Sequence, residues 1–184
     1  MRNRAYGFTL IELLITMAIA AIVASLAVPS FRVLLVKRST QAAAMALVDD
    51  MRFARTEALR RSARMSICSL ADNSTDTCAT VAKKWVNGWL VFVDVDGDGV
   101  VDAGDEIVRV QQPPANIGNI ERDPNPDNTR IKFTFEANGW AKTASEGLIF
   151  TPSGSVPANS TKLVCISNQG RPSLRAEGTS SCTI

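Results

Sequence analysis

A long apolar stretch near the start of the chain is its most distinctive pattern. From Phe8 to Val28 the sequence runs for 21 residues with one charged side chain, Glu12. At about 1.5 Å rise per residue, such a helix measures roughly 30 Å, the thickness of the hydrocarbon core of a bilayer. Arg2 and Arg4 precede it, and basic residues favour the cytoplasmic side. The pattern therefore predicts one membrane helix over residues 8–29, with the following domain outside the cytoplasm.

Residues 30–64 predict a continuation of the same helix, with a bend at Pro29. They contain neither Gly nor Pro and are rich in Ala, Leu, Met and Arg, which favour helices. Apolar residues recur every three or four positions and predict a stripe that packs on the domain: Ala44, Leu47, Val48, Met51, Ala54, Ala58 and Leu59. The arginines between Arg52 and Arg64 are interpreted as the solvated face of this helix rather than as a nucleic-acid-binding stripe.

Beyond the helix, the apolar residues follow the spacing of short strands. Segments rich in Val, Ile, Phe and Trp alternate with turns rich in Gly, Pro, Asn and Asp. Six strands are predicted: Met65–Ser69, Trp89–Val95, Ile107–Gln111, Arg130–Glu136, Gly147–Thr151 and Lys162–Ser167. Residues 112–128, with four prolines, are predicted to form a loop. The expected fold is α+β, in which an antiparallel β-sheet domain over 65–184 buries the stripe of the long helix.

Composition excludes several classes of function. The chain contains no His, which removes His-based catalytic triads, His general bases and His metal ligands. It also lacks a Walker-type phosphate loop and a GxSxG motif, so an enzyme is not expected. Without Arg2 and Arg4 the chain carries 18 basic and 18 acidic side chains. A globally basic nucleic-acid-binding protein is therefore not indicated.

The four cysteines all lie beyond the apolar stretch, in the part of the chain expected outside the cytoplasm, where disulfides persist. Four cysteines permit three pairings. The pairing Cys68–Cys78 with Cys165–Cys182 is favoured because each bond closes a short, turn-rich loop. A zinc site is the competing interpretation, but there is no CxxC spacing and no His to complete it.

An acidic segment between two predicted strands resembles a calcium-binding loop. Acidic residues occupy loop positions one, three, five, nine and twelve, with Gly at six: Asp94, Asp96, Asp98, Asp102, Asp105 and Gly99. The helix pair that flanks such loops in EF-hands is missing, because strands are predicted on both sides. Asp and Gly also build hairpin turns without a metal. A solvated turn is therefore the favoured interpretation, and calcium held by Asp94, Asp96, Asp98 and Asp105 is the alternative.

The start of the chain resembles the class III leader of type IV pilins and type II secretion pseudopilins. The matching residues are Gly7 as the last leader residue, Phe8, Glu12 five residues after the cut, and Pro29. The resemblance implies that prepilin peptidase removes residues 1–7 and that the new N-terminal Phe8 is methylated. It also implies that Glu12 pairs with the N-terminal ammonium of a neighbouring subunit during assembly, because a carboxylate in a membrane helix normally has a partner.

The whole chain is similar to the GspH/FimT branch of pseudopilins and minor pilins, which share the long helix, the hairpin of Trp89–Gly99 and the cysteine-bracketed tail. This resemblance implies a structural subunit of an inner-membrane-rooted filament, with other minor pilins or pseudopilins as partners. Some members bind DNA through a GRxR motif in the tail. Here Gly170 and Arg171 match, but Ser173 replaces the second arginine and the next one is Arg175. DNA binding by Arg171 and Arg175 is therefore the alternative function.

Overall fold

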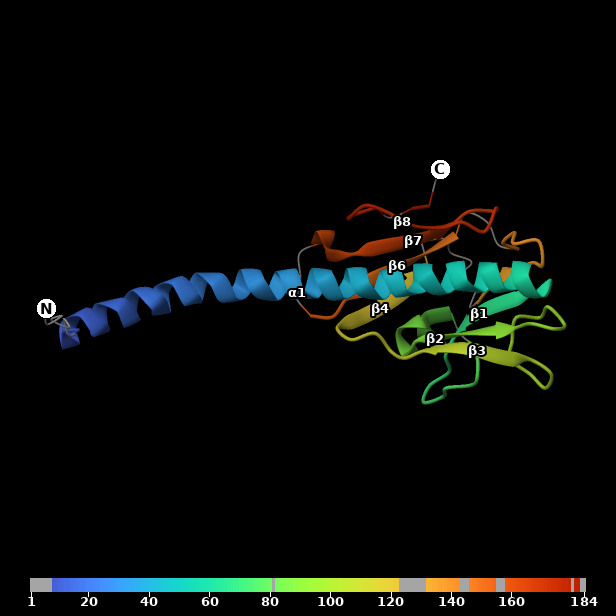
Figure 1. Ribbon diagram of the computed structural model, residues 1–184, viewed down its shortest axis with the longest axis horizontal. Helices are drawn as coiled ribbons and strands as arrows, with labels where there is room; N and C mark the ends of the chain where they lie inside the picture. The colour runs from blue at the N-terminus through green and yellow to red at the C-terminus, as the bar shows by residue number, and fades with distance from the viewer. Residues whose placement is uncertain are drawn as a thin grey trace, which may run out of the picture. The chain divides into compact units, whose positions relative to one another are not determined.

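The computed structural model describes residues 8–80, 82–122, 132–142, 146–154, 158–179 and 181–182 (Figure 1). The chain divides into two compact units, Met1–Leu35 and Val36–Ile184. One long helix, α1 (Leu10–Arg61), contributes residues to both units. The predicted leader, residues 1–7 with Gly7, lies outside the described residues.

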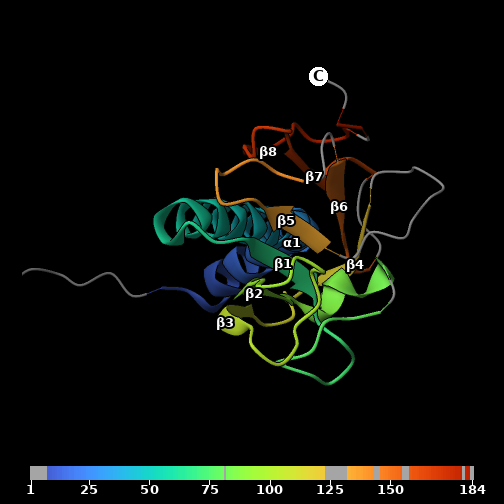
Figure 2. The same cartoon turned by 90° about the vertical axis from the view of Figure 1, so that its right-hand side faces the viewer.

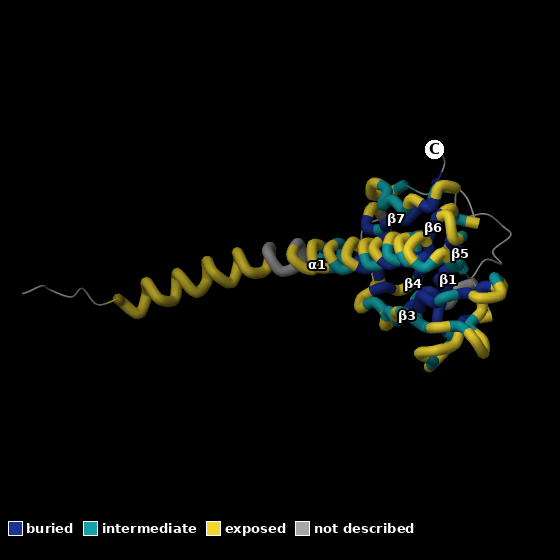
Figure 3. Tube along the Cα trace, turned by 45° about the vertical axis from the view of Figure 1, so that its right-hand side comes forward, coloured by how far each residue is buried: buried dark blue, intermediate teal, exposed yellow. Residues whose placement is uncertain are grey.

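In the first unit, α1 begins with a side-chain cap. Thr9 lies just before the helix, and its Oγ1 accepts a hydrogen bond from the backbone N–H of Glu12 at 3.3 Å. Such a cap satisfies one of the backbone donors that a helix leaves free at its start. Residues 10–25 are all exposed, and Figure 3 shows this part of α1 in yellow. Searched over the described residues, the structure contains no helix with the length and hydropathy of a membrane span.

The second unit holds two four-stranded antiparallel sheets. The first has the order β3-β2-β1-β5, with bounds Glu106–Gln111, Trp89–Val93, Met65–Ser69 and Lys132–Phe135. The second has the order β4-β6-β7-β8, with bounds Ile117–Arg122, Glu146–Pro152, Lys162–Ile166 and Pro172–Leu174. Two short 3-10 helices, η1 (Ala82–Asn87) and η2 (Ala158–Ser160), complete the described elements.

Both sheets pack on the second half of α1, and the three together form one core (Figure 2). The helix contributes a buried stripe that includes Leu47, Val48 and Met51. The first sheet adds Trp89 and Phe135, and the second adds residues such as Phe150. The predicted α+β fold with the helix covered by antiparallel strands is confirmed. Leu59 was wrongly assigned to the stripe, because Ala58 faces the core and Leu59 is 50% exposed.

The helix ends three residues earlier than predicted, at Arg61 rather than Arg64. Ser62 adopts a positive φ of 51°, and the N–H of Ala63 donates to the carbonyl of Ala58 at 3.2 Å. This is the hydrogen bond of a Schellman motif, in which a left-handed residue terminates the helix. Ser62 therefore occupies a conformation usually taken by glycine, and because it is not a glycine, no helix stop was predicted there.

Two strands were missed in the sequence. β4 lies inside the segment predicted to be a loop, and β8 is a three-residue strand beginning at Pro172. The strand predicted at Trp89–Val95 ends at Val93, because Asp94 already belongs to the following turn. The strand predicted from Arg130 is β5, which begins at Lys132, and residues 130 and 131 lie outside the described residues.

Candidate functional site

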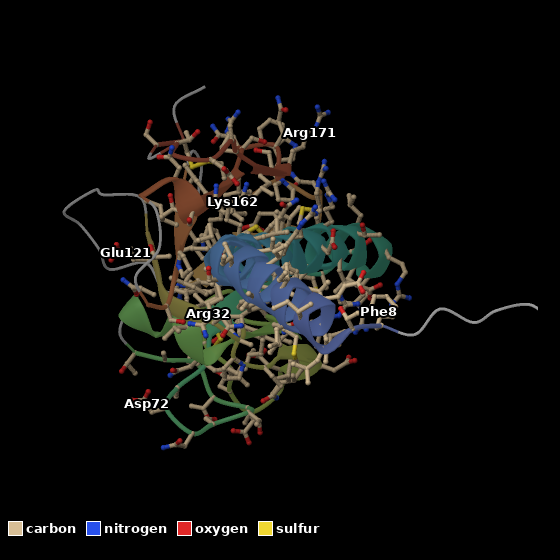
Figure 4. All side chains as sticks on the ribbon, turned by 90° about the vertical axis from the view of Figure 1, so that its left-hand side faces the viewer. Phe8, Arg32, Asp72, Glu121, Lys162 and Arg171 are labelled. Atoms are coloured by element: carbon tan, nitrogen blue, oxygen red, sulfur yellow. A yellow bond between two sulfur atoms is a disulfide. The ribbon has the colours of Figure 1, made fainter. Side chains whose placement is uncertain are left out.

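Glu12 is the one acidic residue in the apolar part of α1, and it lies in the first helical turn. Its backbone is held by Thr9, but its carboxylate has no hydrogen-bond or ion-pair partner within the described part of the chain. Phe8, four residues earlier, is 79% exposed and is labelled in Figure 4. Both residues are thus free to contact another molecule. The cleavage and pairing roles expected of Gly7, Phe8 and Glu12 stay predictions.

The acidic segment after β2 is a compact turn held by its own carboxylates. Asp94 accepts from the N–H of Gly97 at 2.7 Å, Asp96 from Asp98 at 3.0 Å, and Asp98 from Val100 at 2.7 Å. Asp105 closes the segment by accepting from the N–H of Val95 at 3.0 Å. Since each of these carboxylates satisfies a backbone donor, the turn has its own internal hydrogen bonds.

The predicted calcium ligands are only partly brought together. Carboxylate oxygens of Asp94, Asp96 and Asp98 lie within 4.8 Å of one another, whereas Asp105 is not in this group. Partial desolvation, followed by the charges of Asp105 and other carboxylates in the turn, raises the pKa of Asp102. The turn therefore concentrates negative charge, but its observed hydrogen bonds are those of a hairpin.

We expect this turn to fold without calcium. Thermal melts of the full chain in detergent should give the same Tm with calcium as with a chelator, because the carboxylates already hold backbone donors. Asp96→Ala combined with Asp98→Ala is the matched variant. A rise of several degrees in submillimolar calcium that this variant abolishes would establish a metal site instead.

The two candidate DNA contacts, Arg171 and Arg175, lie in different surroundings on either side of β8. Arg171 is exposed just before β8 (Figure 4), whereas Arg175, just after it, is half-buried with an enclosed Nε. Four residues of extended chain separate their Cα atoms by about 13 Å.

At the end of α1, Arg60 and Arg61 donate to Glu57 and lower its pKa to about 2. Arg60 and Arg61 are thus engaged within the chain, and among the described residues Arg171 and Arg175 do not form one compact pair.

The cysteines form the predicted pairs, Cys68–Cys78 and Cys165–Cys182. All four side chains are buried, and each bond closes a local loop of 10 or 17 residues in sequence separation. Gly147 on β6 leaves room for the second bond, because a Cβ there would lie 2.3 Å from the sulfur of Cys182. The disulfides therefore stiffen the ends of β1 and β7 and the segments that follow them.

A buried polar cluster that the sequence did not reveal joins α1 to the first sheet. The carboxylate of Asp50 on α1 accepts from the indole N–H of Trp89 at 2.8 Å and from Arg109 at 2.7 Å. The Asp50 side chain is 5% exposed, and the guanidinium of Arg109 lies 3.9 Å over the ring of Phe53. The position of Asp50, three residues after Leu47 on the buried stripe, was the one available signal.

A long helix whose second half is covered by antiparallel strands is the fold of pilin-like proteins. Residues 43–179 match the family model described as "Type II transport protein GspH", and residues 2–28 match the "Prokaryotic N-terminal methylation motif". The chain belongs to the GspH family. It is accordingly a minor pilin or pseudopilin, a structural subunit of a type IV pilus or a type II secretion system.

Similar proteins agree with this assignment. "Pilin-like protein PilA1" of Thermus thermophilus is 29% identical over 170 residues, which cover 91% of this chain and 97% of the relative. The solved type IV minor pilin FimU of Pseudomonas aeruginosa has a TM-score of 0.58 at 20% identity, covering 79% of this chain and 96% of FimU. The minor pseudopilin EpsH of Vibrio cholerae has a TM-score of 0.50 at 13% identity, covering 79% and 99%. At these identities the two structures support the fold alone.

Proposed function

We propose that prepilin peptidase cuts this chain between Gly7 and Phe8, and that the mature subunit assembles with other minor pilins or pseudopilins into a filament. Residues 8–29 anchor it in the inner membrane, and the domain lies in the periplasm. The observation that carries the proposal is the apolar stretch with a single acidic residue, Glu12, directly after the glycine. The match of residues 2–28 to the N-terminal methylation motif supports it.

The charge of Glu12 supplies a mechanism that couples processing to assembly. A carboxylate within a membrane helix costs about 3 kcal/mol even on lenient insertion scales. Cleavage after Gly7 creates an ammonium at Phe8, which a neighbouring subunit can offer to Glu12. Pairing the two charges removes most of that cost, whereas an uncut subunit has no such ammonium to offer. Assembly is therefore favoured for processed subunits.

The domain suits a structural role outside the cytoplasm. The domain contains two disulfides, and such bonds persist in oxidising compartments such as the periplasm. The absence of His from the sequence removes the commonest general base, and the acidic turn uses its carboxylates for its own backbone. We therefore propose that the subunit acts through contacts with its neighbours and performs no catalysis.

Processing is tested by the mass of the membrane-extracted protein. In a host with an active prepilin peptidase, we expect the mass to fall by residues 1–7 and to rise by one methyl group, which peptide sequencing should place on Phe8. Gly7→Val is the control, because a branched side chain at the cut should block the peptidase and leave the full-length chain. Recovery of only the uncut wild-type chain would contradict the proposed processing.

A further inference from the structure

We infer that one surface patch of the domain binds a different filament subunit, through a partner surface that places apolar side chains next to carboxylates. The inference rests on the proposed function and names one contact within the filament. The patch, called the Trp140 patch, consists of Arg55, Leu59, Trp140 and Arg171. Three segments build it: the last turns of α1, the turn after β5, and the turn between β7 and β8, where Figure 4 labels Arg171.

The three segments meet at the carbonyl group of Gly139, in the turn after β5. This carbonyl accepts a hydrogen bond from Nε of Arg55 on α1 at 3.1 Å. Gly170 of the other turn lies so close that a Cβ there would overlap the same carbonyl. The N–H of Ala141 donates to the carbonyl of Asn168 at 3.0 Å and joins the two turns directly. Backbone contacts therefore fix the frame from which the side chains of the patch project.

The centre of the patch is apolar and uncovered. Leu59 is 50% exposed and Trp140 is 54% exposed, whereas Trp85 and Trp89 are buried in the core. The two exposed side chains are neighbours, because Leu59 packs against Gly139, the residue before Trp140. Isolated apolar side chains are ordinary on protein surfaces. Two large ones flanked by arginines instead match the composition of binding hot spots, which are enriched in Trp and Arg.

The rim of the patch has an excess of positive charge. Arg55 donates to a neutral carbonyl, and among the described residues the guanidinium of Arg171 has no partner. The two turns, residues 136–142 and 167–171, contain one acidic side chain, Glu136, and one further basic one, Lys142. Three cations thus face one anion. An arginine pairs best with a carboxylate, because its planar fork matches the two oxygens.

The neighbouring charges on α1 do not balance this excess, because they are already paired within the chain. The pairs are Arg52 with Asp49, Arg109 with Asp50, and both Arg60 and Arg61 with Glu57. Arg55 is the one charged residue of 49–61 without an ion pair in the described part of the chain. The chemistry that fits the patch is therefore an apolar side chain beside carboxylates.

A different protein subunit is the occupant that these features favour. The aliphatic side chain of Leu59 needs an apolar partner surface, which a phosphate backbone does not offer. Interfaces with nucleic acid are also much more strongly positive than this patch. A symmetric contact with a second copy would place the same arginines opposite each other, and like charges across an interface are unfavourable.

The test uses the full chain in a host that assembles the filament. Gln169 is exposed in the turn before Arg171, so Gln169→p-benzoylphenylalanine places a photo-crosslinker at the rim of the patch. After irradiation of sheared filaments, we expect an adduct of this chain with another pilin or pseudopilin, mapped by mass spectrometry. Trp140→Ala or Arg171→Glu should lower its yield at least about tenfold, as expected for a hot-spot residue.

A carboxylate-to-lysine change in the mapped partner segment should restore the yield of Arg171→Glu, which a misfolded variant would not allow. Both variants should keep the Tm within about 2 °C of the wild type in detergent, because exposed substitutions hardly change stability. The matched controls are Val95→Ala, an exposed apolar residue, and Arg38→Glu, an exposed cation on α1; neither should change the yield.

Three results would overturn the contact while leaving the filament function intact. They are an adduct with a second copy of this chain, an adduct that nuclease removes, and equal yields in all variants. Absence of the wild-type chain from sheared filaments would overturn the proposed function and the contact with it.

Discussion

Glu12→Gln should remove the chain from filaments while its domain stays folded. The substitution keeps the size of the side chain but removes the charge that pairs with the ammonium of Phe8 on a neighbouring subunit. Losing a charge pair inside a membrane removes a stabilisation of several kcal/mol, which corresponds to a loss of incorporation of more than about tenfold. Immunoblots of sheared filament fractions, compared with whole-cell amounts, measure the effect.

The control for this experiment is Thr16→Ala on the same helix. It removes a hydroxyl that donates to the carbonyl of Leu13 at 2.9 Å but changes no charge, so incorporation should stay near the wild-type level. Cleavage after Gly7 should proceed in both variants. Incorporation of Glu12→Gln at the wild-type level would refute electrostatic pairing as the link between processing and assembly.

Asp50→Ala should lower the free energy of unfolding of the domain by about 3 kcal/mol, because it leaves one buried hydrogen-bond donor without an acceptor and one half-exposed guanidinium without its counter-charge. The indole N–H of Trp89, which is fully buried, would lose its acceptor, and Arg109 would lose its counter-charge next to the core. For a domain of this size the expected fall in Tm is about 10 °C. Chemical denaturation of the full chain in detergent, followed by tryptophan fluorescence, gives the free energy.

Asp49→Ala provides a matched comparison one residue away. Asp49 makes a surface ion pair with Arg52 at 3.3 Å, and both side chains are about 60% exposed. Exposed pairs of this type contribute from zero to about 1 kcal/mol, so stability should hardly change. Equal effects of the two substitutions would show that the buried cluster does not hold α1 to the first sheet.

The elements that sequence reasoning located are those with a regular local pattern. The stripe of α1 repeats every three or four residues over several turns, and strands such as β7 are continuous apolar runs. The disulfide pairing followed from loop lengths alone, because Cys68 and Cys165 each have a partner nearby in sequence.

β4 escaped detection because a bulge disrupts its pattern. The register with β6 shifts between Ile117 and Asn119, so Ile117 and Ile120 are both buried although their spacing is odd. A regular strand would place residues three apart on opposite faces. The prolines that suggested a loop flank the strand and do not interrupt it.

The candidate sites also depend on contacts that no local sequence pattern predicts. The turn of Asp94–Asp105 could be located by its composition, but the hydrogen bonds that occupy its carboxylates depend on the folded backbone. The cluster of Asp50 with Trp89 and Arg109 joins residues 39 and 59 positions apart, and no local pattern encodes such a contact.

The placement of the two disulfides has a mechanical consequence. Both bonds close loops within the sheet domain, and neither ties α1 to a strand. A filament under tension loads each subunit between its helix and its domain. That load is carried by the packed stripe of α1 and the Asp50 cluster, which contain no covalent link. Reducing the disulfides should therefore leave the packing of α1 on the two sheets unchanged.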